Sequence, residues 1–387
     1  MFNIEHFLLF SFLFGLSFFL TKIPQKNYER NFWGAVAIFV IAYTIIVGLR
    51  YGWGHDYVRY EYSYNMLEYD YSKDYDLAYW NLYKIEKGLG LSFAGSVLLS
   101  TLLIIVSYFY IVKAMKGDKY MLMCFLPATL MTTTYAMRQF QAIAYINIAI
   151  GLLLSSDNIL KKRKKHIIIA ALLIFLAYHT HGSSISYAIP FLVCIIFRNI
   201  KPIPYTIAIL AYLGTIMLAD IIAPYMNNIF LSLIENISVT DHLQGYVNNA
   251  DVKLFGADSV DEATFAYGGA FQIFHYISYV CLLYITGKSL KIKQNQNVTY
   301  IYNIVAIAIL VQEVFFSQEM IRRLIDPFAI LYFIPLGYAI NIYLENRRKK
   351  FKGYPLYGLC ISILLLRIFY PFISFLTKFS MAGFVWD

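Results

Sequence analysis

The chemistry of this sequence is concentrated in a few short polar stretches between long apolar ones. The first is the octet at residues 50–57, RYGWGHDY, in which two glycines separate Arg50 from His55 and Asp56. Arginine binds phosphate oxygens through a two-pronged fork, and a carboxylate or an imidazole can take a proton from a hydroxyl. Two interpretations are open for the octet: a ligand site, or a turn at the membrane surface from which Arg50 extends to lipid headgroups.

A second polar pair, Arg138 and Gln139, comes between two apolar runs, where Arg138 could bind a ligand or lipid headgroups. A third stretch, YHTHGSS at 178–184, carries His179 and His181 in a tight turn. Such a pair could act as a base, as a phosphate donor or as plain hydrogen-bonded loop residues. A His-x-His pair alone is a weak metal signal, and we expect no metal site.

A fourth stretch, EMIRRLID at 319–326, carries two adjacent arginines, Arg322 and Arg323. Glu319 and Asp326 lie three or four residues from an arginine, which is the spacing of ion pairs on a helix. The stretch is therefore either a structural cluster of ion pairs or a second anion-binding arginine group.

The elements that carry these stretches are predicted to be membrane helices. The chain of 387 residues is 59% hydrophobic and 14% charged, whereas soluble domains carry about 25% charged residues. A helix needs about 20 apolar residues to cross a bilayer. The sequence therefore predicts an all-α, polytopic membrane protein, 1–387 forming one membrane domain, with about twelve spans near residues 5–21, 33–49, 93–112, 120–135, 139–154, 166–180, 183–198, 205–223, 270–286, 298–316, 324–343 and 355–373.

The orientation follows from the distribution of positive charge. Six short connections hold 21 of the 32 lysines and arginines, whereas the two long loops, 50–92 and 224–269, are mainly acidic and aromatic. Short basic connections stay in the cytoplasm, so both long loops, both termini and all four polar stretches are expected on the outer side. The net charge of +9 is then a topology signal, and we expect no nucleic acid partner.

Further polar groups accompany the arginines on the outer side. Loop 50–92 alternates tyrosines with carboxylates, which suits either sugar faces and hydroxyls or an interfacial aromatic belt. Within the spans, the few charged residues lie toward the outer ends, which favours surface chemistry over a proton relay: Asp220, Glu313, Asp326 and Arg367. The four cysteines lie inside spans and are expected to be buried apolar groups. No P-loop, GxGxxG or HExxH pattern occurs, so no nucleotide cofactor is expected.

These motifs resemble the EpsG/Wzy-type polysaccharide polymerases of bacterial envelopes. Residues 48–57, GLRYGWGHDY, with Tyr60 following, are similar to the family segment lRYGvGtDYxxY, although His55 replaces a threonine. Arg138 with Gln139 resembles the family's Arg-Gln segment, and His181-Gly182-Ser183 resembles its His-x-Ser turn. Arg323 resembles a late arginine, but the following Asp-Pro departs from the family pattern and leaves the register between Arg322 and Arg323 open.

The resemblance implies a GT-C-like glycosyltransferase that joins undecaprenyl-pyrophosphate-linked oligosaccharide repeat units at the outer face of the bacterial cytoplasmic membrane. The arginines Arg50, Arg138, Arg322 and Arg323, with Gln139 and Tyr57, would bind the pyrophosphate and substrate, without a metal. Asp56 or His181 would serve as base; alternatively, Asp56 orients Arg50. A flippase and a chain-length regulator are the candidate partners, beside membrane lipids. The alternatives are a lipid-linked glycan ligase or other lipid-phosphate-dependent glycosyltransferase, and a flippase or transporter of lipid-linked sugars.

Overall fold

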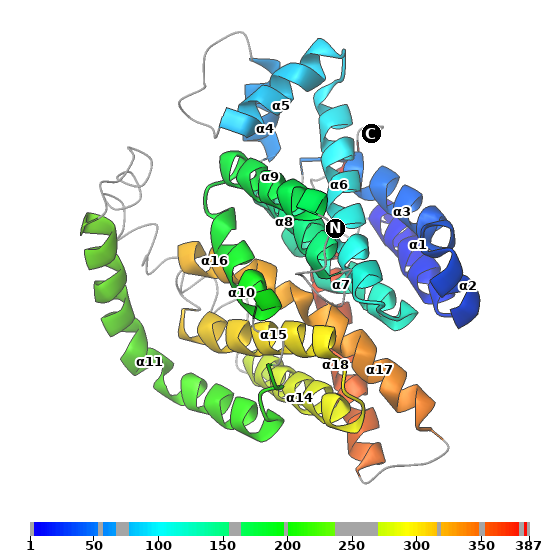
Figure 1. Cartoon of the computed structure of the whole chain (residues 1–387), viewed down its shortest axis with the longest axis vertical. Coiled ribbons are helices and arrows are strands. Elements are labelled where there is room, and N and C mark those ends of the chain that lie inside the picture. Colours follow the sequence, from blue (N-terminus) through cyan, green and yellow to red (C-terminus); the bar gives the residue numbers. More distant parts are fainter. Residues whose placement is uncertain are drawn as a thin grey trace.

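The computed structural model describes residues 4–52, 57–66, 77–154, 164–196, 200–236, 270–315, 319–347, 353–378 and 383–384. Almost all of these residues are helical (Figure 1). In chain order the elements are α1 (Ile4–Leu20), α2 (Gln25–Arg30), α3 (Phe32–Gly48), β1 (Arg50–Tyr51), α4 (Tyr57–Asn65), α5 (Leu77–Gly88), α6 (Phe93–Ala114), α7 (Lys119–Tyr135), α8 (Met137–Leu154), α9 (Lys164–Thr180), α10 (Ser184–Ile196), α11 (Tyr205–Asn236), α14 (Ala270–Ile292), α15 (Gln296–Val314), α16 (Glu319–Ala329), η3 (Ile330–Tyr332), α17 (Phe333–Glu345), α18 (Tyr354–Lys378) and β2 (Gly383–Phe384).

Each predicted span coincides with a helix, and the last but one corresponds to α16, η3 and α17 together. Four helices are long and apolar enough to cross a membrane, and five further apolar helices of 10–17 residues accompany them within the described ranges. The four are Phe93–Ala114, Met137–Leu154, Gln296–Val314 and Leu324–Glu345. The prediction of an all-α, polytopic membrane protein is confirmed.

Polar side chains fix where several helices begin. Asn31, Ser92, Asp118 and Asn295 precede α3, α6, α7 and α15, and each accepts a hydrogen bond from a backbone N–H of the first turn. Such caps satisfy donors that have no partner within the helix. They set the register of each helix and therefore the depth of every side chain along it.

The helices pack closely through a continuous apolar core. At Gly337 of α17, a Cβ atom would lie 2.3 Å from the backbone of Met121 in α7, so the glycine is what allows these two helices to meet. At Gly48, the last residue of α3, a Cβ would lie 2.9 Å from Cα of Leu98 in α6. The four cysteines are buried and form no disulfide, as expected.

Helix α11 is longer than its predicted span. It continues to Asn236 through Pro224, whereas the sequence predicts that the span ends at 223 and that loop 224–269 follows. Proline removes one helical hydrogen bond and bends a helix, but it does not have to end one. Figure 1 shows α11 bending away from the other helices along its length. Residues 237–269, the rest of the predicted loop, lie outside the described residues.

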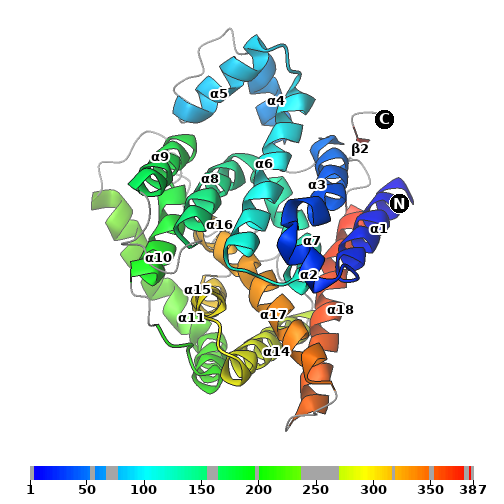
Figure 2. The same cartoon turned by 45° about the vertical axis from the view of Figure 1, so that its right-hand side comes forward.

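The predicted loop 50–92 is largely folded. It contains β1, α4 and α5, and both views show α4 and α5 beyond the end of α6 that begins at Phe93 (Figures 1 and 2). β1 pairs with β2 near the C-terminus in an antiparallel two-stranded sheet, with Arg50 opposite Phe384. β2, which follows α18 in the chain, therefore lies on the same side of the helices as β1.

Candidate functional site

Arg50 is held at the junction of α3 and α6. The close approach at Gly48 brings this end of α3 against α6, and the Arg50 side chain is buried, with 2% exposure. Its Nη1 donates to the carbonyl oxygen of Val47 at 2.7 Å and to Oγ1 of Thr101 at 3.1 Å. The Nε–H of Arg50 is buried and has no acceptor among the described residues.

The chain turns sharply after Arg50. Gly52 has a φ of +67°, a left-handed conformation that glycine adopts without strain. His55 and Asp56 lie outside the described residues, and the chain resumes at Tyr57 in α4. The rings of Tyr51 and Tyr57 meet edge to face, 5.7 Å between centroids.

The charge states around Arg50 follow from burial. Burial lowers the pKa of the Arg50 guanidinium to about 10, so the side chain remains a cation at neutral pH. Burial, and then the nearby Glu61 carboxylate, raises the pKa of the Tyr57 phenol to about 12. Tyr57 is therefore a neutral hydroxyl that can donate a hydrogen bond beside a cationic arginine.

The tyrosines of α4 and α5 form an aromatic core of their own, which we call the outer aromatic cluster: Tyr57, Tyr60, Tyr64, Tyr79, Tyr83, Phe93, Val97 and Met137. The Tyr64 hydroxyl donates to the carbonyl of Leu91 at 2.9 Å, and the hydroxyls of Tyr79 and Tyr83 are hydrogen-bonded to each other. The buried rings of this cluster therefore cannot contact a sugar. They pack against one another and stabilise the loop. Tyr51 and Tyr62 are exposed, at 49% and 54%.

This cluster joins the first and second polar stretches. Cζ of Arg138 lies 5.9 Å from the ring centroid of Tyr79, within the range of a cation–π contact. Gln139, the next residue of α8, is buried. Tyr57 belongs to the same cluster as Met137, which precedes Arg138. The structure thus brings Arg50, Tyr57 and the start of α8 to one region.

The histidine stretch forms the turn between α9 and α10. The backbone N–H of His181 donates to the carbonyl of Ala177 at 2.9 Å, and the carbonyl of His181 accepts from the N–H of Ser184 at 2.9 Å. The His179 ring packs on Phe175, 4.4 Å between centroids. Helices α8 and α9 are packed neighbours connected in sequence, so this turn lies at the same end as the start of α8.

The fourth stretch lies in α16, which packs against α10 and α15; the rings of Tyr187 and Phe328 are 4.9 Å apart. Arg322 and Arg323 are in the first turns of α16, but their side chains lie outside the described residues. Oδ1 of Asp326 accepts a hydrogen bond from Nε2 of Gln312 at 3.1 Å. The expected ion pair between Arg322 and Asp326 thus stays a prediction. The contact that the structure shows for Asp326 is this hydrogen bond from Gln312 of α15.

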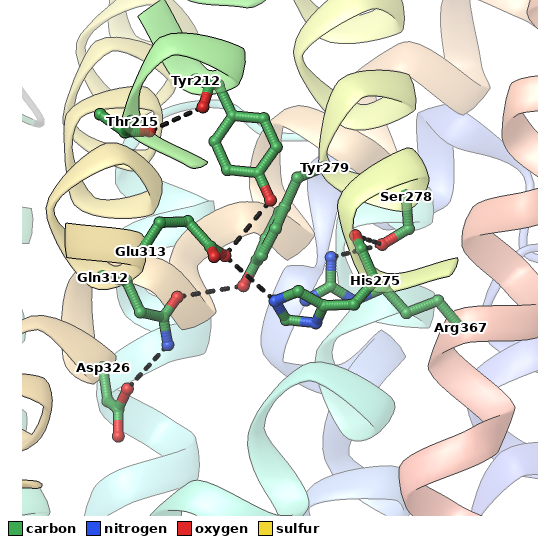
Figure 3. Close-up of polar contacts among 9 residues, drawn as sticks. All are labelled: Tyr212, Thr215, His275, Ser278, Tyr279, Gln312, Glu313, Asp326 and Arg367. Carbon is green, nitrogen blue, oxygen red and sulfur yellow. Dashed lines mark hydrogen bonds and ion pairs between the residues drawn. The ribbon is translucent and has the colours of Figure 1, made fainter. Parts of the chain in front are cut away.

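A further polar cluster, which the sequence interpretation did not identify, lies among α11, α14, α15 and α18 (Figure 3). Nε2 of His275 lies 3.2 Å from Oε1 of Glu313, and the hydroxyl of Tyr212 donates to the same oxygen at 3.2 Å. Glu313 stood out in the sequence as a charge within a span, but His275 did not. A histidine in the apolar run 270–286 was the signal that could have found it.

Among the described residues, no set of three or more histidine, cysteine, aspartate or glutamate side chains is arranged to hold a metal ion.

Comparison with known proteins identifies the family of the chain. Residues 33–381 match the EpsG family. The chain belongs to the EpsG family. No curated protein and no solved structure matches it. As an EpsG-family protein it is a multi-pass membrane protein with a role in polysaccharide polymerisation. The matched range includes all four polar stretches and the His275–Glu313 pair.

Proposed function

We propose that this EpsG-family protein joins undecaprenyl-pyrophosphate-linked oligosaccharide repeat units at the outer face of the bacterial cytoplasmic membrane. It is a glycosyltransferase whose leaving group is the lipid pyrophosphate. The growing chain leaves its own lipid carrier and is transferred to a hydroxyl of a new lipid-linked unit. The active site faces the periplasm or the cell exterior, and a flippase and a chain-length regulator are the partners expected in the cell.

The observation that carries the proposal is the state of Arg50. Its Nη1 is fixed by two protein oxygens, whereas its buried Nε–H has no acceptor among the described residues. A buried donor without a partner is costly, by about 1–3 kcal/mol, and more for a charged group. A phosphate oxygen of the substrate would satisfy that donor, while the two bonds of Nη1 hold the guanidinium in place.

The reaction needs little beyond charge stabilisation at the leaving group. As the bond from the anomeric carbon to the pyrophosphate oxygen breaks, negative charge develops on the pyrophosphate, and fixed arginines stabilise it without a metal ion. The outer aromatic cluster includes Tyr57, which is close to Arg50, and Tyr79, whose ring Arg138 contacts, and this supports placing both arginines at one site. Arg322 and Arg323 of α16 complete the proposed set, with Gln139 and Tyr57 as neutral hydrogen-bonding groups.

The acceptor hydroxyl also needs a base, because an alcohol is a weak nucleophile until its proton is removed. Asp56 and His181 are the two candidates that the motifs supply. Asp56 follows Arg50 by six residues and can instead orient the guanidinium.

The test is a reconstituted reaction. Purified protein in nanodiscs receives the native lipid-pyrophosphate-linked repeat unit, with EDTA present and nucleotides absent, and the products are separated on a gel. A ladder of repeats is expected from the wild type and from Arg59→Ala, a matched change at an exposed arginine of α4. Arg50→Ala should make no ladder. A folded wild type that transfers the glycan only to a different acceptor, or only moves the lipid across the bilayer, would replace the proposal with a ligase or a flippase.

A further inference from the structure

The polar cluster around His275 has no part in the function proposed above. It forms where α11, α14 and α15 meet, with α18 packed on α14 and α16 packed on α15. His275 lies in the second turn of α14 and Glu313 in the last turn of α15. Both positions are at the expected outer ends of these spans, on the side where the arginines are.

The His275–Glu313 pair has the geometry of a base and the group that orients it. The Glu313 side chain is buried, with 5% exposure, whereas His275 retains 19%. A carboxylate only accepts hydrogen bonds, so Nε2 of His275 carries the proton that faces Glu313, and the lone pair is on Nδ1. The hydroxyl of Tyr212, in α11, also donates a hydrogen bond to Glu313 and so holds the carboxylate in place.

Neighbouring residues fix the imidazole ring in place. The ring of Tyr279 meets it edge to face at 4.8 Å, and the Tyr279 hydroxyl donates to Oε1 of Gln312 at 3.1 Å. Arg367 in turn contacts Tyr279: Cζ of Arg367 lies 3.7 Å from the centroid of the Tyr279 ring. Nη1 of Arg367 donates a hydrogen bond to Oγ of Ser278 at 2.7 Å. Figure 3 shows this cluster, with Tyr212 from α11, the histidine and Tyr279 from α14, Glu313 from α15, Arg367 from α18 and Asp326 from α16.

The residue that precedes Glu313 is hydrogen-bonded to α16, the helix that carries Arg322 and Arg323. Gln312 precedes Glu313 in α15 and donates to Asp326 of α16. Asp326 follows Arg322 and Arg323 by about one helical turn. The proposed pyrophosphate-binding helix and the histidine therefore both contact α15, at the adjacent residues Gln312 and Glu313.

We infer that His275, positioned by Glu313, is the general base for the acceptor sugar hydroxyl; this rests on the proposed function. The hydroxyl proton moves to Nδ1 of His275 while the hydroxyl oxygen forms its bond to the anomeric carbon. The bond from that carbon to the pyrophosphate oxygen breaks, and its electron pair leaves with the pyrophosphate. The imidazolium that results faces the Glu313 carboxylate and returns its proton to water. His275 is a catalytic residue in this scheme and Glu313 a positioning residue, and Asp56 is left to orient Arg50.

The test is the pH dependence of ladder formation in a single turnover. A general base contributes about 10²- to 10⁴-fold to rate, and its protonation produces the acid limb of the pH–rate profile. His275→Gln should lower the rate by about that factor and abolish the acid limb, because glutamine keeps the hydrogen bond to Glu313 but accepts no proton. The other groups facing His275 stay unchanged in this variant: Tyr212, Tyr276, Tyr279, Glu313, Asp326 and Arg367.

Two further variants make the outcome specific. Glu313→Gln keeps the size of the side chain and removes its charge; it should lower the rate less than His275→Gln and displace the acid limb without removing it. His166→Gln, at the start of α9, is the matched control and should behave as wild type. If His275→Gln does not fold, His275→Asn takes its place, with folding checked by size-exclusion chromatography.

The two proposals fail in different ways. A wild-type ladder together with an unchanged rate and acid limb in the His275 variants would overturn the base assignment alone and return the role to Asp56 or His181. A rate loss with the acid limb intact would make the cluster structural and would also overturn the assignment. A wild type that makes no ladder would overturn the polymerase proposal and the base assignment with it.

Discussion

Tyr51 pairs with Gly383 in the antiparallel ladder between β1 and β2. One residue follows the buried arginine directly, and the other comes after the last membrane helix. Ten predicted spans separate them, an even number, which agrees with their lying on the same side of the membrane. The pairing thus supports the parity of the predicted topology independently of the distribution of lysines.

This pairing predicts that a disulfide can be introduced. Paired residues of antiparallel strands have Cα atoms about 4.5–5.5 Å apart, and a disulfide spans about 4.4–6.8 Å. Tyr51→Cys combined with Gly383→Cys should crosslink under mild oxidation, seen as a shift on a non-reducing gel after proteolysis between the two positions. Each single variant is a control, since the natural cysteines are buried. A double variant that stays reduced would contradict the pairing.

The contact at Gly48 predicts a loss of activity without replacement of any residue of the proposed site. In Gly48→Ala the new methyl would meet the backbone of Leu98, so α3 must move away from α6, and the bond from Arg50 to Thr101 lengthens or breaks. Misplacement by about 1 Å can lower a rate about 100-fold. Polymer yield per unit time measures this.

A second glycine gives the control. Gly15→Ala, in α1, adds a methyl that meets nothing within 4 Å. It should leave the rate unchanged and, by reducing the freedom of the unfolded chain, stabilise the protein by up to about 1 kcal/mol. Equal losses in both alanine variants would mean that the α3–α6 contact does not position Arg50.

The guanidinium geometry of Arg50 predicts that a positive charge alone at position 50 does not support full activity. Arg50→Lys keeps the positive charge, but its three N–H donors all come from one nitrogen. It therefore cannot bond Val47 and Thr101 from one atom and a phosphate oxygen from another, as the guanidinium can. Loss of one such donor costs about 10²- to 10³-fold in rate. Arg59→Lys, at an exposed site, should be neutral. Full activity in Arg50→Lys would reduce Arg50 to a simple charge.

Asn147 predicts a stability effect in the interior. Its Oδ1 accepts from the Tyr187 hydroxyl at 3.0 Å and its Nδ2 donates to Oγ of Ser107 at 3.3 Å, which ties α8 to α10 and α6. Asn147→Ala breaks both bonds and should cost about 1–3 kcal/mol. Tyr187→Phe breaks only one and should cost less. Thermal unfolding in detergent would rank the two, and the reverse order would show that the amide is not the centre of this network.

The spans could be predicted from the sequence because an apolar run long enough to cross a bilayer has few other structures available. Arg50 could be singled out because a charged residue directly after an apolar span is costly beside hydrocarbon and is not needed for insertion. The burial of Tyr60 and Tyr79 in one cluster could not be predicted, because the alternation of aromatic and acidic residues in this loop does not determine which rings face inward. The His275–Glu313 pair depends on how α14 packs against α15, and nothing local to either helix encodes that.

The sheet that joins β1 and β2 also has a consequence for how the protein is made. Arg50 and Tyr51 precede ten of the predicted spans, and their strand partners Phe384 and Gly383 follow all ten. Until β2 is made, the backbone groups of β1 that face it lack these strand partners. The segment around the proposed donor site is therefore completed only after α18 and β2 have been made, so a chain that stalls before β2 would carry the arginine without its strand partner.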